Sequence, residues 1–219
     1  MNINSFIKRF VTSFLLLILF ICMFYYNIIL IISLILLGIQ ALFEMNNLFF
    51  KILKKKFYIL LCNILSFIYL FFIFILIYYA VIKENYIQEY KLYIFYSILI
   101  SICSDVGGYI IGNIFKGKNL IKISPNKTIS GSIGSFLFPI CLIPIFISDF
   151  QNISLNYLII STFVISFISQ AGDLFFSYLK RMAKIKDTGN ILPGHGGILD
   201  RIDSIIFSVP LGFFIFNLY

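Results

Sequence analysis

Four carboxylates interrupt strongly apolar sequence in this chain. They are Asp105, Asp173, Asp200 and Asp203, out of nine acidic residues in 219. A charge held at a bilayer is costly, so such residues are functional-site candidates. Carboxylate oxygens suit Mg²⁺, which proteins usually hold with one or two carboxylates plus substrate phosphates. The carboxylates therefore predict a divalent cation site. The alternative interpretation is helix capping and salt bridging, and it applies best to Asp200.

A glycine-rich loop, Pro193-Gly194-His195-Gly196-Gly197, precedes the last apolar segment. Glycine allows close backbone approach, and N–H groups at a helix start bind phosphate well. We expect Gly196 and Gly197 to contact phosphate. We expect His195, the only histidine, to hydrogen-bond a phosphate or to transfer a proton. The alternative is a plain turn into a membrane helix.

Basic and hydroxyl side chains supply further candidate phosphate ligands. Ser124, Lys127 and Thr128 lie in one short polar segment that precedes small residues. The segment lacks P-loop spacing, and the alternative is a polar turn. Arg201 lies between two aspartates at a helix start, where it can pair with them or bind a phosphate through its fork of donors.

Transmembrane helices must position these residues. The chain is 61% hydrophobic with a mean hydropathy of +1.02, well above the usual apolar content of soluble domains. The apolar segments are continuous, which excludes an outer-membrane barrel with its alternating strands. We predict an all-α polytopic membrane protein with one integral membrane domain over 1–219. The N-terminal spans would lie in 10–91, and the catalytic spans and loops in 92–219.

About seven transmembrane helices are predicted. They cover 57–82, 92–115, 131–148, 154–176 and 198–216, and 10–43 is either one long helix or a hairpin turning near Asn27. Residues 44–56, including Glu44, are interpreted as a loop. The hairpin is preferred because it places the main basic clusters on the cytoplasmic side. The active site is then expected at the cytoplasmic interface of the inner membrane.

The net charge of +8 comes from basic residues in the loops between these spans. We interpret them as orientation signals that can also attract anionic lipid or a nucleotide. Nucleic-acid binding is not expected, because no basic face is interleaved with exposed aromatic residues. The four cysteines lie apart in apolar segments, so neither a zinc site nor a disulfide framework is indicated.

The spacing over 177–203 resembles the signature of the phosphatidate cytidylyltransferases, also called CDP-diacylglycerol synthases. It reads Ser-x-Leu-Lys-Arg-x₄-Lys-Asp-x-Gly-x₂-Leu-Pro-x-His-Gly-Gly-x₂-Asp-Arg-x-Asp. Three other segments resemble family motifs in the same order: Ser104-Asp105-x-Gly107-Gly108-Tyr109, Ser124-Pro125-x-Lys127-Thr128 and Gly172-Asp173-Leu174. The N-terminal half resembles the family only as generic spans. Two family carboxylates are missing, since Ser130 and Phe176 stand in their places.

The resemblance implies that CTP and phosphatidic acid react to give CDP-diacylglycerol and pyrophosphate, in a Mg²⁺-dependent nucleotidyl transfer of phospholipid biosynthesis. It assigns Mg²⁺ to Asp173 and Asp203, with Asp105 and Asp200 next, and suggests a second cation such as K⁺. The residues that it places near phosphates are Ser124, Lys127, Thr128, Lys180, Arg181, His195 and Arg201. The expected partners are CTP, phosphatidic acid and membrane lipid. The oligomeric state stays open, with a homodimer as one option.

Other membrane functions compete with this one. The main alternative is a cation- or proton-coupled transporter, because intramembrane carboxylates also mark ion pathways. It predicts carboxylates at mid-membrane and repeated halves, whereas these cluster at one interface and no repeat is visible. A CDP-alcohol phosphotransferase would carry an Asp-Gly-x₂-Ala-Arg motif, which does not occur. A CTP-dependent lipid kinase stays open.

Overall fold

The computed structural model describes residues 3–83, 89–121, 124–150, 152–192 and 196–219, with backbone alone at 3–6, 8, 9, 120, 121 and 124–126. Helices dominate it, which confirms the all-α class. The chain forms two compact units. Unit 1 comprises Met1–Tyr78 and Leu179–Ile202, and unit 2 comprises Tyr79–Tyr178 and Asp203–Tyr219.

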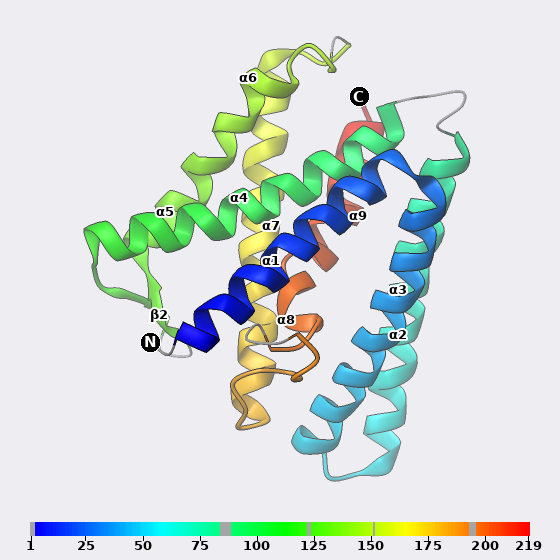
Figure 1. Ribbon diagram of the computed structural model, residues 1–219, viewed down its shortest axis with the longest axis vertical. Helices are drawn as coiled ribbons and strands as arrows, with labels where there is room; N and C mark the ends of the chain where they lie inside the picture. The colour runs from blue at the N-terminus through cyan, green and yellow to red at the C-terminus, as the bar shows by residue number, and fades with distance from the viewer. Residues whose placement is uncertain (1–2, 84–88, 122–123, 151, 193–195) are drawn as a thin grey trace. The chain divides into compact units, whose positions relative to one another are not determined.

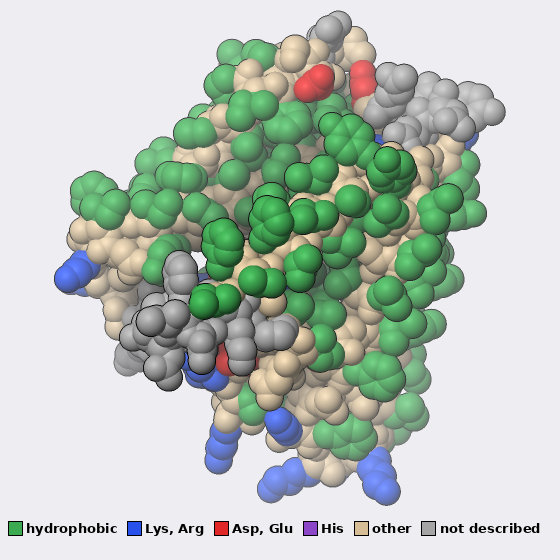
Figure 2. All heavy atoms as spheres, viewed as in Figure 1, with side chains coloured by type: hydrophobic (Ala, Val, Ile, Leu, Met, Phe, Trp, Pro, Cys, Tyr) green, Lys and Arg blue, Asp and Glu red, His purple; other side chains and the backbone are tan. Residues whose placement is uncertain are grey.

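Five helices in the described part of the chain are long and apolar enough to cross a membrane: α2 (Asn27–Ile52), α3 (Lys56–Lys83), α4 (Glu89–Phe115), the segment Ile129–Phe146, and α7 (Leu155–Met182). Figure 2 shows hydrophobic side chains over much of the visible surface, as expected of helices that face lipid. These helices indicate a membrane protein. The count of seven spans stays a prediction.

Residues 10–43 form two helices in unit 1. α1 (Ile3–Tyr25) ends before Tyr26, whose backbone is extended, and α2 begins at Asn27. Figure 1 shows the chain reversing at this point. A single long helix over 10–43 is therefore wrong, and the break lies where the hairpin was expected to turn.

α2 extends much farther than predicted. It continues to Ile52, so Glu44 lies within a helix and not in a 44–56 loop. One face of α2 buries Ala41, Glu44 and Leu48, at the i, i+3 and i+7 spacing of a packed helix face. The polar residues after position 43 hid this face in the sequence.

The core of unit 2 packs α4 against α7 and α9 (Ile205–Asn217). Apolar residues fill it, while hydroxyl pairs join the helices: Tyr96 with Thr162 (2.8 Å), Ser101 with Ser208 (2.5 Å) and Ser104 with Ser166 (3.1 Å). Helices in lipid gain little from apolar burial alone, so close packing and polar pairs between helices hold them together.

Glycines bring α4 very close to α5 (Ile129–Leu137). A Cβ added at Gly107 would lie 2.6 Å from the carbonyl oxygen of Gly134, and one added at Gly134 would lie 2.6 Å from that of Gly107. A Cβ at Gly131 would lie 2.8 Å from the oxygen of Gly108. Small residues at such positions let two backbones approach directly. This contact fixes the helix that carries Asp105 against the helix that follows Lys127.

A short antiparallel hairpin connects α4 to α5. β1 (Asn119–Ile121) pairs with β2 (Ser124–Thr128), with Asn119 opposite Thr128 and Ile121 opposite Ser124. The sequence predicted only a basic loop here. At its end Thr128 caps α5, because its Oγ1 accepts the N–H of Gly131 at 3.1 Å. The cap holds Lys127 at the start of α5.

The last predicted span, 198–216, is not one helix. α8 (Leu199–Ile202) ends before Asp203, and α9 begins at Ile205. The carboxylate of Asp203 accepts the N–H of Ser204 at 2.9 Å, a local bond that competes with helical hydrogen bonding. α9 has 13 residues and is about 20 Å long, shorter than the roughly 30 Å hydrocarbon core.

Between α5 and α7 the chain forms two short helices, η1 (Phe138–Leu142) and α6 (Ile143–Phe146).

Candidate active site

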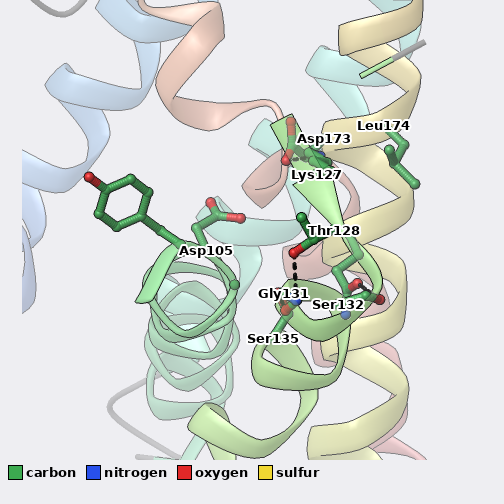
Figure 3. A pocket seen from close by; sticks show the side chains of 11 residues that line it. Asp105, Lys127, Thr128, Gly131, Ser132, Ser135, Asp173 and Leu174 are labelled. Atoms are coloured by element: carbon green, nitrogen blue, oxygen red, sulfur yellow. Dashed lines mark hydrogen bonds and ion pairs between the residues drawn. The ribbon is translucent and has the colours of Figure 1, made fainter. Parts of the chain in front are cut away.

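Unit 2 contains a cavity of about 240 Å³ that four elements line. Figure 3 shows its side chains converging from α4, β2, α5 and α7. The lining residues are Asp105, Gly108, Tyr109, Lys127, Thr128, Gly131, Ser132, Ser135, Gln170, Asp173 and Leu174. Three segments that the sequence singled out, around Asp105, Lys127 and Asp173, thus meet at one cavity.

An ion pair between Lys127 and Asp173 crosses this cavity (Figure 3). The Nζ atom of Lys127 donates to Oδ2 of Asp173, and Ser177 Oγ donates to Oδ1 at 3.3 Å. The lysine and aspartate side chains keep 28% and 25% of their surface exposed. Partly exposed ion pairs contribute little to stability, so Lys127 can exchange Asp173 for an anionic ligand at small cost.

Asp105 enters the same cavity from α4. Its side chain is exposed, and Oδ2 accepts the hydroxyl of Ser204 at 3.1 Å. Asp203, the residue before that serine, is only 6% exposed and does not line the cavity. Within unit 2 the structure therefore brings Asp105, Asp173 and Lys127 together and places Asp203 one residue from a partner of Asp105.

The sequence reasoning missed three polar residues of the cavity, Ser132, Ser135 and Gln170. Ser132 Oγ donates to Gln170 Oε1 at 2.8 Å. The amide nitrogen of Gln170 is buried and has no hydrogen-bond partner among the residues that the structure describes. All three residues interrupt apolar segments at 131–148 and 154–176. That interruption was the available signal.

Unit 1 holds a second group of signature residues, centred on Asp200. Lys180 Nζ donates to its Oδ1 at 2.8 Å, while Oδ2 accepts the N–H groups of Thr188 (2.8 Å) and Gly197 (3.0 Å). Burial alone would raise the pKa of Asp200, but the Lys180 hydrogen bond and the two backbone donors lower it below its usual value. The Asp200 carboxylate is therefore charged at neutral pH and joins Lys180 to Thr188 and Gly197.

Among the other signature residues of unit 1, the two glycines are hydrogen-bonded through their backbones and the two arginines are exposed. Gly196 has φ +86°, a left-handed conformation that favours glycine, and its carbonyl accepts the N–H of Leu192 at 3.0 Å. The N–H of Gly197, a predicted phosphate donor, is bonded to Asp200. Arg181 and Arg201 are exposed. His195 and the side chain of Ser124 lie outside the described residues.

The carboxylates of the two units can be compared with the ligands that Mg²⁺ prefers. No group of three or more His, Cys, Asp or Glu side chains in the described ranges is placed to hold a metal ion. The cavity of unit 2 nevertheless offers two carboxylates, Asp105 and Asp173. This set fits Mg²⁺, which commonly takes one or two protein carboxylates and completes its shell with substrate phosphates and water.

Comparison with known proteins gives one family. A model described as the cytidylyltransferase family matches residues 4–219. Over 136 residues, 61% of the chain, the sequence is 43% identical to the phosphatidate cytidylyltransferase of Bacillus subtilis (strain 168), covering 51% of that relative. It is 45% identical to those of Staphylococcus haemolyticus (strain JCSC1435) and Staphylococcus aureus (strain COL) over 122 residues, 54% of the chain and 46% of each relative. The match thus spans about half the length of these relatives.

Proposed function

The chain belongs to the cytidylyltransferase family, and from this we propose that it is a phosphatidate cytidylyltransferase that converts CTP and phosphatidic acid to CDP-diacylglycerol and pyrophosphate. The cavity of unit 2 carries the proposal. There a partly exposed lysine and two carboxylates from separate elements line one space. The name shared by the relatives supports the same activity.

The proposed reaction is a displacement at phosphorus. A phosphate oxygen of phosphatidic acid attacks the α-phosphorus of CTP, and the bond from that phosphorus to the oxygen of pyrophosphate breaks. A phosphomonoester has a second pKa near 6, so this nucleophile is largely ionised at neutral pH without a general base. Positioning the two anionic substrates and neutralising their charge are then the main tasks of the protein.

Lys127 and Thr128 are the proposed phosphate ligands of the cavity. The Nζ atom of Lys127 would leave Asp173 for a phosphate oxygen, because a charge-assisted hydrogen bond to phosphate replaces the one that it gives up. Thr128 remains fixed as the cap of α5. Gln170 offers a buried amide donor beside them.

Mg²⁺ is the proposed cofactor. Asp173 and Asp105 would hold it in the cavity, and it would neutralise phosphate charge when bound. Asp203 stays a candidate Mg²⁺ ligand on the resemblance alone. The second cation is likewise proposed on the resemblance alone. Asp200 is better suited to ordering the loop, since its two oxygens already accept three strong hydrogen bonds.

In unit 1, the exposed Arg181 and Arg201 are the proposed contacts to substrate phosphates. The left-handed Gly196 is the better phosphate candidate of the two glycines, because the amide of Gly197 is already used by Asp200. His195 keeps its proposed role in hydrogen bonding or proton transfer.

The proposed location is the inner membrane, with the active site facing the cytoplasm. Two observations support the membrane assignment: the described residues contain five helices long and apolar enough to cross a membrane, and the relatives are bacterial. CTP is a soluble anion and phosphatidic acid a lipid, so the reaction requires a site that both can reach at the interface.

A labelling experiment tests the proposal and separates it from the competing lipid kinase. Purified protein in lipid nanodiscs would receive phosphatidic acid, Mg²⁺ and CTP labelled at either the α- or the γ-phosphate. Cytidylyl transfer places α-label in the lipid and γ-label in pyrophosphate, whereas a kinase places γ-label in the lipid. A folded sample that yields neither CDP-diacylglycerol nor pyrophosphate would refute the proposal. The comparisons give no support to a transporter.

A further inference from the structure

Glu44 is a buried acidic residue within the apolar helix α2. It is 2% exposed, and each of its carboxylate oxygens accepts two hydrogen bonds. Oε1 accepts from Gln40 Nε2 and from the N–H of Ile198, both at 3.0 Å. Oε2 accepts from Thr188 Oγ1 at 2.5 Å and from the N–H of Leu199 at 2.9 Å. The carboxylate therefore ties α2 to a loop more than 140 residues away.

Thr188 links Glu44 to Asp200. Its Oγ1 lies 2.5 Å from Glu44 Oε2 and 3.0 Å from Asp200 Oδ2, and its backbone N–H donates to the same Asp200 oxygen. Asp200 in turn accepts from Lys180. A continuous set of hydrogen bonds thus runs from α2 through the loop to the Lys180–Asp200 pair, all within unit 1.

Two glycines of the loop pack directly against the Glu44 carboxylate. A Cβ at Gly197 would lie 2.2 Å from both Glu44 Oε2 and Thr188 Oγ1, and one at Gly189 would lie 2.9 Å from Glu44 Oε1. Any larger residue would push the loop away from the acid. Contact with Glu44 therefore explains why positions 189 and 197 are glycine, without a phosphate.

We propose that Glu44 is a positioning residue that holds residues 188–192 and 196–200 in one conformation for the reaction, which rests on the proposed cytidylyltransferase function. Glu44 touches no substrate. It acts on Asp200 through Thr188, and on α8 through the N–H groups of Ile198 and Leu199. A carboxylate fits this place best, because a glutamine would turn its NH₂ group toward a backbone N–H in either orientation, that of Ile198 or that of Leu199.

The test compares Glu44→Gln and Thr188→Val, singly and combined, with Ser33→Ala as control. Ser33 is buried on the same helix, and its hydroxyl donates within that helix to the carbonyl of Leu30 at 2.8 Å. The readouts are amide hydrogen exchange over 196–202, and kcat and KM for CTP and phosphatidic acid. Exchange reports the loop whether or not the protein is active.

Glu44→Gln is expected to speed exchange over 196–202 at least tenfold and to lower kcat on the order of 10²-fold, as for a misplaced catalytic element. KM should change by less than about threefold, because substrate contacts are retained. Thr188→Val should act in the same direction, and the double variant should be little worse than Glu44→Gln, since both interrupt one network. Ser33→Ala should match wild type.

Wild-type exchange and kcat in Glu44→Gln would overturn the proposal, and so would a loss of kcat with unchanged exchange over 196–202. If Glu44→Gln unfolds, Thr188→Val decides the question. Faster amide exchange confined to 196–202 supports the proposal, and unchanged exchange over these residues rejects it. A wild-type protein that is folded but inactive would reject the proposed function. Loop-confined exchange in its Glu44→Gln variant would still support Glu44 as the anchor of the loop.

Discussion

The close contact of α4 with α5 predicts that Gly107→Ala damages catalysis from outside the cavity. The new methyl carbon would lie 2.4 Å from Phe138 Cβ and 2.6 Å from the carbonyl oxygen of Gly134. Ordinary contact begins at 3.4 Å, which exceeds the 2.4 Å to Phe138 Cβ by 1.0 Å. The helices must therefore separate by about 1 Å. The carbonyl belongs to the backbone of α5 and cannot move alone.

The expected losses follow from that displacement. Overpacking of this kind costs about 1–3 kcal/mol of stability. Asp105 lies two residues before Gly107 on α4, while Lys127 and Thr128 immediately precede α5. A shift of about 1 Å between catalytic groups lowers kcat/KM on the order of 10²-fold. The loss of activity should therefore exceed what the loss of folded protein explains.

Gly38→Ala provides the matched control. It is the same substitution within a helix, but a Cβ at Gly38 meets nothing within 4 Å. Its activity should equal wild type, and its stability should stay equal or rise by up to about 1 kcal/mol from helix propensity. The assays are kcat/KM in nanodiscs and thermal unfolding in the same lipid. Wild-type kcat/KM in Gly107→Ala would refute the reasoning, and equal damage in Gly38→Ala would show that the effect is not local.

Three further predictions concern charged residues. Lys127→Met should lower kcat/KM for CTP by roughly 10- to 150-fold, the equivalent of one hydrogen bond to a charged group, whereas Lys127→Arg should retain part of the activity; equal losses in both would argue against a phosphate contact. Asp203→Asn should abolish turnover while the protein stays inserted and folded, and near-normal turnover would remove Asp203 from the metal site. The lowered pKa of Asp200 means that its stabilisation of the loop is present above the ordinary value of 3.8 and is lost as pH falls through the lower, native value. Loop exchange, corrected for intrinsic rates, should therefore be constant between about pH 7 and 5 in wild type and faster in Asp200→Asn at pH 7; a wild-type loop that loosens in this range would contradict the assignment.

Local sequence features predicted the fold class, one helix break, the family and several site residues. The apolar segments predicted a helical membrane protein, because hydropathy is a property of each segment by itself. The break near Asn27 was visible as a polar interruption. The family followed from motif spacing, since the signature residues are close in sequence and their order is independent of packing. Asp105, Lys127 and Asp173 were chosen for their residue types, their places beside apolar segments and their motifs, and the structure places all three at one cavity.

Long-range contacts decided the rest. The polar residues 44–56 predicted a loop, but Glu44 lies buried in α2 because donors from 188–199 satisfy its carboxylate. The single span at 198–216 is interrupted where Asp203 bonds the backbone of Ser204. Neither effect leaves a periodic signal in the chain.

The sequence by itself determined that the protein is a membrane protein of the cytidylyltransferase family, and which residue types serve its chemistry. Only the tertiary structure decided which partners they have. It paired Lys127 with Asp173 and Lys180 with Asp200, and it gave the amide of Gly197 to a carboxylate. The physical reason is that a charged or polar group in an apolar protein must find its partner wherever packing brings one, and packing joins residues that the chain keeps far apart.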